Sequence, residues 1–140
     1  MNLCPCGGKG DAAGCSCSAV RLARFREKLS RALLDRFDLV VAMPRPRAVE
    51  LDGSGEEPSA LVCERVRAAR ERLEAKPPRM SAEARALLTD AVERMSLSGR
   101  GRARVSRVAR TIAALAGAEE IGPGHLAEAL SYRIPPELTS

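Results

Sequence analysis

Four cysteines within the first 17 residues constrain this chain more than any other feature. They form two Cys-x-Cys pairs, Cys4 with Cys6 and Cys15 with Cys17, separated by eight residues of which four are glycine. In a reducing compartment, paired cysteines are more typical of a metal site than of disulfides. Four thiolates can surround one zinc ion and leave no open position for catalysis, so we expect a structural zinc site, with reactive or incidental thiols as the alternative. The fifth cysteine, Cys63, stands alone, and we expect it to be a small core residue.

The apolar composition predicts a mainly helical fold. Only two Phe, one Tyr and no Trp occur among the 140 residues, so the core must be built from Leu, Val, Ile and Ala, which suits close-packed helices. Later in the chain, Ser81 and Ser98 are expected to be the N-caps of two helices. Another helix is expected to start at Pro123, because proline suits the first helical position. Together with a helix just after residue 59, they predict a compact four-helix bundle. The inward stripe of that earlier helix is expected to contain Val62, Val66, Ala69 and Leu73.

The chain before the bundle has a different pattern. A helix is expected after Ser18, and the β-branched run from Phe37 to Met43 predicts one strand. A single strand cannot form a sheet, so we expect its partners to lie outside this chain. Prolines and glycines in residues 44–59 predict a linker. The predicted organisation is therefore an N-terminal part over residues 1–43, the linker 44–59 and a helical domain over residues 60–140.

The charge balance narrows the class of partner. The net charge is +5 and most of the cations are arginines, which favours polyanions such as nucleotide phosphates or nucleic acid without choosing between them. No apolar run approaches the length of a membrane span, and no secretory leader opens the chain. We expect no membrane partner and a location in a bacterial-type cytoplasm.

Two arginine-containing motifs are candidates for phosphate recognition. Arg36 lies between two aspartates where a predicted helix meets the predicted strand; it can reach out as a phosphate ligand, and a local salt bridge with Asp35 or Asp38 is the simpler alternative. Between residues 97 and 115 lie five arginines and no acidic residue. Arg100 falls in the first turn of the expected helix, where backbone N–H groups and the helix dipole favour an anion. The spacing predicts that Arg100 shares an outward face with Arg104 and Arg107, and a solvated basic face is the alternative.

Several of these motifs occur in the order found in one family of ATPases. The segments that carry the likeness are Asn2-Leu-Cys-Pro-Cys-Gly7, Cys15-Ser-Cys17, Leu33-Leu-Asp-Arg-Phe-Asp38, Leu97-Ser-Gly-Arg100 with Val108-Ala-Arg-Thr-Ile-Ala113, and His125-Leu-Ala-Glu-Ala-Leu-Ser-Tyr-Arg133. In these segments the chain resembles the magnesium-chelatase-like AAA+ ATPases of the ComM/YifB family. It departs from the family pattern at Leu3, where a proline is usual, and at Ala114, where an aspartate is common.

The resemblance implies a fold and a set of roles. The helices after the linker correspond to the helical lid of an AAA+ module, and the N-terminal part to a remnant of its α/β core. Asn2 resembles the sensor-1 residue that positions the attacking water. Arg36 resembles the arginine finger, which is supplied to the ATP site of a neighbouring subunit, and Arg100 resembles the sensor-2 arginine, which reaches the γ-phosphate of its own subunit. Family members of the ComM type are hexameric ATP-driven motors that promote DNA branch migration in transformation.

One part of an ATPase is missing from the sequence. No Gly-x-x-x-x-Gly-Lys-Ser/Thr loop and no apolar strand ending in paired acids occur, so the chain offers no site of its own for Mg·ATP, and we expect no ATP hydrolysis by it alone. Met1 falls where the family has an internal residue, which favours a truncated gene, a split reading frame or a cut contig. The alternative function is a zinc-containing adaptor that binds nucleic acid or an ATPase partner through its Arg-rich helix. The single histidine, His125, is expected to have a packing or capping role.

Overall fold

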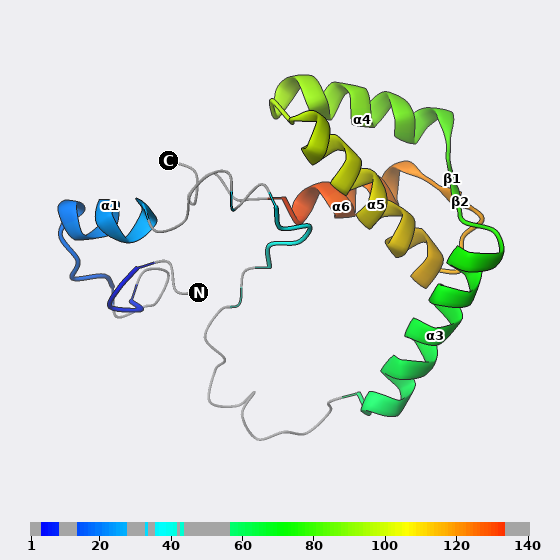
Figure 1. Ribbon diagram of the computed structural model, residues 1–140, viewed down its shortest axis with the longest axis horizontal. Coiled ribbons are helices and arrows are strands. Elements are labelled where there is room, and N and C mark those ends of the chain that lie inside the picture. Colours follow the sequence, from blue (N-terminus) through cyan, green and yellow to red (C-terminus); the bar gives the residue numbers. More distant parts are fainter. Residues whose placement is uncertain are drawn as a thin grey trace. The chain divides into compact units, whose positions relative to one another are not determined.

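The computed structural model describes residues 4–8, 14–27, 33, 36–41, 43 and 57–133 (Figure 1). The chain divides into two compact units, one comprising Met1–Ser54 with Ile134–Ser140 and the other Gly55–Arg133. Helices dominate the described residues, with one short parallel two-stranded sheet, so the predicted helical class is confirmed. Among these residues no helix combines the length and the apolar character needed to cross a membrane.

The first unit contains helix α1, Ala19–Glu27. The Oγ of Ser18 accepts a hydrogen bond of 3.3 Å from the backbone N–H of Arg21, so the predicted N-cap is confirmed. The predicted strand from Phe37 to Met43 is wrong for the residues that can be described there, because none of 37–41 and 43 is in a strand. The physical reason is that a strand is held by hydrogen bonds to a neighbour, and no described segment pairs with this one.

The second unit is built on four helices: α3 (Ser59–Ala75), α4 (Ala82–Arg94), α5 (Gly99–Leu115) and α6 (Pro123–Ser131). Ser81 and Ser98 cap α4 and α5 through Oγ atoms that accept backbone N–H bonds of 3.1 and 3.0 Å. Pro123 is the first residue of α6. Gly117 follows α5 with φ of 71°, a left-handed conformation that glycine adopts without the steric cost of a Cβ. The helix starts predicted from the sequence are confirmed.

The core of this unit lies where α4, α5 and α6 meet. Its members are small or aliphatic, as the shortage of aromatic residues requires. Four of the nine buried residues are alanines, whose small side chains let neighbouring helices pack closely. The buried cluster consists of Ala84, Leu88, Val105, Val108, Ala109, Ala113, Ile121, Leu126 and Ala129.

Two short strands of two residues each form a small sheet. One lies between α3 and α4 and the other between α5 and α6. Strand β1, Arg79–Met80, pairs in parallel with β2, Glu120–Ile121. The backbone N–H of Ser81 also donates to the carbonyl of Ile121 at 3.1 Å, which extends the contact up to the N-cap of α4. This sheet was not predicted, because two-residue strands are too short to show an alternating pattern.

Helix α3 is only partly covered by the rest of the unit. Its N-terminal end extends away from α4, α5 and α6 (Figure 1). Ala69 is buried, but Val62 and Val66 are each 38% exposed, and Cys63 is exposed as well. The expectation that Val62 and Val66 point into a core was wrong, as was the expectation that Cys63 is a core residue. Helical spacing identifies an apolar stripe, but it does not show how far along the helix a neighbour covers that stripe.

Candidate functional site

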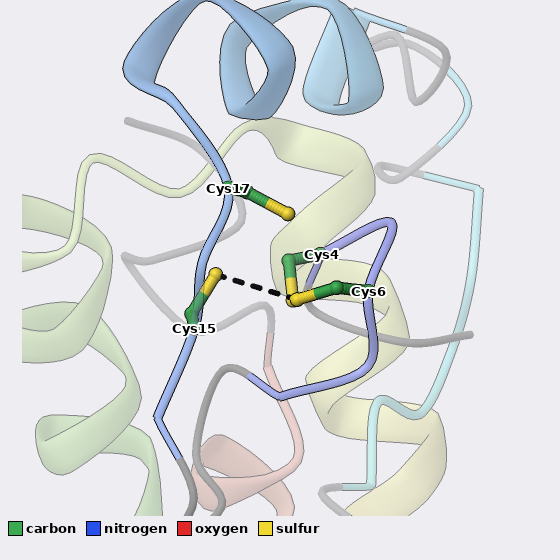
Figure 2. Close-up of side chains that lie close together, drawn as sticks. All are labelled: Cys4, Cys6, Cys15 and Cys17. Atoms are coloured by element: carbon green, nitrogen blue, oxygen red, sulfur yellow. Dashed lines mark hydrogen bonds between the residues drawn. The ribbon is translucent and has the colours of Figure 1, made fainter.

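The four N-terminal cysteines converge in the first unit. Figure 2 shows their side chains turned toward one another from the two Cys-x-Cys segments. The Sγ atom of Cys6 lies 3.4 Å from that of Cys4 and 3.7 Å from that of Cys15, and all four Sγ atoms lie within 4.8 Å of one another. This confirms that the sequence pairs form one cluster, and four sulfur atoms so placed can hold a metal ion.

Backbone turns at glycine bring the two segments together. The N–H of Gly7 donates to the carbonyl of Cys4 at 3.2 Å, which closes a turn between the first two cysteines, and φ is 76° at Gly7 and 73° at Gly14. A Cβ on Gly8 would lie 2.3 Å from the carbonyl oxygen of Gly14, so no other residue fits at Gly8 without moving the backbone. The cluster therefore depends on a close approach of main chain to main chain, which only glycine allows.

The thiols of the cluster differ in acidity. The backbone N–H of Gly8 donates to the Cys6 sulfur at 3.4 Å, and this bond, with contributions from Cys4 and Cys17, lowers the pKa of Cys6 to about 6. At Cys15 the backbone N–H of Cys17 favours the thiolate, but desolvation and the neighbouring thiols outweigh it and raise the pKa to about 11. At neutral pH Cys6 is therefore mainly a thiolate even without a bound cation. A metal ion would favour ionisation of the other thiols.

The second candidate feature is the N-terminal turn of α5. Arg100 is the second residue of that helix, is exposed, and forms no ion pair with any residue in the described ranges. The Oγ of Ser98 accepts a hydrogen bond from the backbone N–H of Gly101 in the same turn. Arg100 is therefore a cation that no described acid pairs with, at the positive end of the helix dipole, which suits it to an anionic ligand.

The arginines of α5 differ in exposure. Arg102, Arg107 and Arg110 are exposed, whereas Arg104 is half-buried. Arg104 lies one turn after Arg100, on the same broad face as predicted. It is rotated by about 40° around the helix axis, toward the edge of the packed side, so it is less exposed than expected.

Arg133, for which the sequence predicted no role, also lies at this end of α5. A Cβ built on Gly101 would lie 3.6 Å from its Nη2 atom. The Arg133 guanidinium, from the last residue of the unit, thus lies beside the first turn of α5, which also carries Arg100. The only sequence signal was the place of Arg133 at the end of the last motif.

The remaining predicted residues have separate positions. Arg36 is exposed in a turn, with its N–H donating to the carbonyl of Leu33 at 2.9 Å, and it forms no salt bridge with Asp38. Asn2 and Asp35 lie outside the described residues. His125 caps α6, because its Nδ1 accepts the backbone N–H of Gly122 at 3.1 Å, which confirms the expected capping role.

Two family models match the chain. The model described as magnesium chelatase, subunit ChlI, matches residues 1–51, and the model described as magnesium chelatase, subunit ChlI C-terminal, matches residues 74–133. The first match contains the cysteine cluster and Arg36, and the second contains Arg100 and Arg133. Residues 52–73, between the two matches, include the second half of the predicted linker and most of α3.

Curated relatives are similar over most of this chain. An uncharacterized protein of Mycobacterium bovis is 37% identical over 94% of the chain, YifB of Salmonella typhimurium 35% identical over 84%, and the competence protein ComM of Haemophilus influenzae 33% identical over 83%. The chain spans 30% of the first relative and 26% of each of the other two, which is less than a third of their length.

Proposed function

Because this chain belongs to the magnesium-chelatase-like family that includes YifB and ComM, we propose that it supplies the lid and the sensing arginines of an AAA+ ATPase. The observation that carries the proposal is Arg100, an exposed cation without an ion pair among the described residues in the Ser98-capped first turn of α5. A guanidinium there can bind the γ-phosphate of ATP and respond to its loss. Helices α3 to α6 would then be the lid that carries this arginine.

Arg36 would serve a second ATP site. It is exposed in a turn and makes no salt bridge within the described residues, so its guanidinium can reach a neighbouring molecule. In a hexamer, as in the full-length family, it would stabilise the charge that develops on the transferred phosphoryl group in the adjoining subunit. Asn2 would orient the attacking water. ATP and Mg²⁺ would be bound in the context of a complete ATPase core.

The cysteine cluster would hold one structural zinc ion. With Zn–S bonds of about 2.3 Å, the edges of a tetrahedral site are about 3.8 Å long. The Sγ separations of 3.4 and 3.7 Å are close to that length, and no two of the four Sγ atoms are more than 4.8 Å apart. Thiolate ligation also requires a reducing compartment such as the cytoplasm. The zinc would tie the two Cys-x-Cys segments together and would take no part in hydrolysis, since the four thiolates fill its coordination.

For the whole protein we propose a motor that remodels DNA. The support is the likeness to a relative named a competence protein, together with the branch-migration activity that the family resemblance implies. The excess of arginine over acidic residues on α5 is compatible with a polyanionic partner.

A chimera tests the assignment of the arginines. The chain would replace the matching segment of the Haemophilus influenzae relative, and steady-state ATP hydrolysis would be measured for the chimera and its Arg36→Ala, Arg100→Ala and Arg85→Ala variants. Arg85 is an exposed arginine of α4 and serves as the matched control. We expect roughly a thousand-fold loss for Arg36→Ala, a clear loss for Arg100→Ala, and no change for Arg85→Ala.

Two results would contradict the proposal. One is equal turnover by the Arg100 and Arg85 variants. The other is an inactive chimera beside an active parent protein. We expect the chain by itself to hydrolyse no ATP. ATPase activity that copurifies with the chain would contradict this expectation.

A second candidate is a nucleic-acid-binding adaptor. It is favoured by the exposed Arg102, Arg107 and Arg110 on a helix without acidic residues. If α5 binds phosphates, affinity for duplex DNA should fall steeply with salt, and each arginine replaced by alanine should reduce the slope of log K against log[salt] by about 1. An unchanged slope in the triple variant would exclude this use of α5.

A further inference from the structure

The cysteine cluster is not uniform in its access to solvent. Cys4 is 0% exposed and Cys17 is half-buried, whereas Cys6 and Cys15 are exposed. The two exposed sulfurs belong to different Cys-x-Cys segments and lie 3.7 Å apart (Figure 2). A soluble oxidant can therefore reach two adjacent sulfurs across the cluster without first disturbing the buried one.

The pair Cys6 and Cys15 is also well placed to form a disulfide. An S–S bond is about 2.05 Å long, so the two sulfurs must approach by less than 2 Å. The competing pair of Cys4 and Cys6 is nearer, at 3.4 Å, but it would close a small ring around Pro5, whose φ is fixed by its own ring. Its second member is also the buried thiol. Geometry therefore favours the bond between the segments over the bond within one segment.

We propose that Cys6 and Cys15 form a peroxide-sensitive site whose oxidation to a disulfide releases the metal from the cluster. The proposal rests on the metal site described above. The thiolate of one cysteine attacks an oxygen of a hydroperoxide, which breaks the O–O bond, gives a sulfenic acid and releases hydroxide or alkoxide. The thiolate of the other cysteine attacks that sulfur and expels a second hydroxide. The two sulfurs together lose two electrons, the peroxide gains them, and protons from water complete the balance.

Metal release follows from the loss of ligands. A disulfide sulfur is no longer a thiolate, and the remaining pair, Cys4 and Cys17, cannot complete a four-sulfur site. The disulfide would keep the two segments together after the metal has left. Reduction by a thiol would restore both thiolates, so the change is reversible.

The test uses the full chain in a Cys63→Ser background, which removes the thiol outside the cluster. The zinc-loaded and metal-free forms are treated with hydrogen peroxide, free zinc is followed with a chromogenic chelator, and the products are digested with trypsin under non-reducing conditions. Cleavage after Lys9 and Arg21 places Cys4 and Cys6 in residues 1–9 and Cys15 and Cys17 in residues 10–21. A bond between the segments thus joins two peptides, whereas a bond within a segment leaves them separate.

We expect the joined peptides to be the main product, zinc to appear in step with them, and a thiol reductant to reverse both. In the metal-free form the link should persist in Cys4→Ser and Cys17→Ser and disappear in Cys6→Ser and Cys15→Ser. Separate peptides with internal disulfides, or zinc loss with only sulfinic acid formed, would overturn the proposal. A chain that takes up no zinc but still forms the Cys6–Cys15 link would refute the metal site and metal release, and leave the oxidation site standing.

Discussion

The guanidinium of Arg72 in α3 donates a hydrogen bond of 3.1 Å from its Nη1 atom to the backbone carbonyl of Ala114 near the end of α5. The same carbonyl also accepts the backbone N–H of Gly117 at 3.1 Å, so Arg72 supplies a second, charged donor. A cation at the end of a helix also interacts favourably with the helix dipole. The same guanidinium lies beside Gly117, where an added Cβ would be 3.8 Å from its central carbon. Arg72 thus ties the less covered helix of the second unit to the best packed one.

Replacing Arg72 with alanine should loosen this attachment. We expect the free energy of unfolding to fall by about 1–2 kcal/mol, because a partly buried carbonyl loses a charged donor. Urea denaturation followed by far-ultraviolet circular dichroism measures the change. Arg70→Ala, an exposed arginine on the same helix, is the control and should change stability by less than about 0.5 kcal/mol. Equal effects of the two variants would show that the Arg72 bond contributes nothing specific.

A second prediction concerns the close approach of Gly8 to Gly14 in the cysteine cluster. Gly8→Ala should weaken zinc binding, because its Cβ would meet the carbonyl oxygen of Gly14 at 2.3 Å and force the two segments apart. Competition with a chelator of known affinity measures the loss. In Gly124→Ala, where nothing lies within 4 Å of the added Cβ, zinc affinity should be unchanged. Unaltered affinity in Gly8→Ala would mean that the metal-bound cluster does not use this close approach.

Capping of α5 can be tested at Ser98. Ser98→Ala removes the Oγ that accepts from Gly101 at 3.0 Å and should destabilise the second unit by about 1 kcal/mol. Ser106→Ala is the matched control, since the Ser106 hydroxyl donates to the Arg102 carbonyl, a bond within the helix that adds little. Thermal denaturation of the two variants should separate them, and a Ser106 variant as unstable as the Ser98 variant would contradict the capping argument.

The unequal acidities of the thiols predict a pH profile. In the metal-free chain, alkylation of Cys6 by iodoacetamide should rise through a midpoint near pH 6, because its lowered pKa of about 6 makes it a thiolate above that pH. Cys15, with its pKa raised to about 11, should stay slow until strongly alkaline pH. Tandem mass spectrometry of the peptides 1–9 and 10–21 assigns the label to Cys6 rather than Cys4 and to Cys15 rather than Cys17. A common midpoint near about 8.5, the value of a free cysteine, would contradict the assigned environments.

Local chemistry in the sequence was enough to predict much of the second unit. Serine side chains at 81 and 98 satisfy the backbone N–H groups of the turn that follows them, and glycine at 117 accepts a positive φ, so both ends of α5 could be read from adjacent residues. The grouping of the four cysteines also follows from short spacings in one segment. These features depend on neighbours a few residues apart.

Other features depend on segments that are distant in sequence. The strand predicted at residues 37–43 requires a pairing partner, the β1–β2 pair joins residues about 40 positions apart, and the exposure of Val62 and Val66 depends on where α5 stops covering α3. Within the cysteine cluster, only the folded backbone, crossing at Gly8 and Gly14, buries Cys4 and leaves Cys6 and Cys15 exposed side by side. The sequence by itself determined which residues can cap, turn or ligate, because those properties are local. The tertiary structure decided which of them meet, because burial and pairing are set by contacts between segments that sequence spacing does not define.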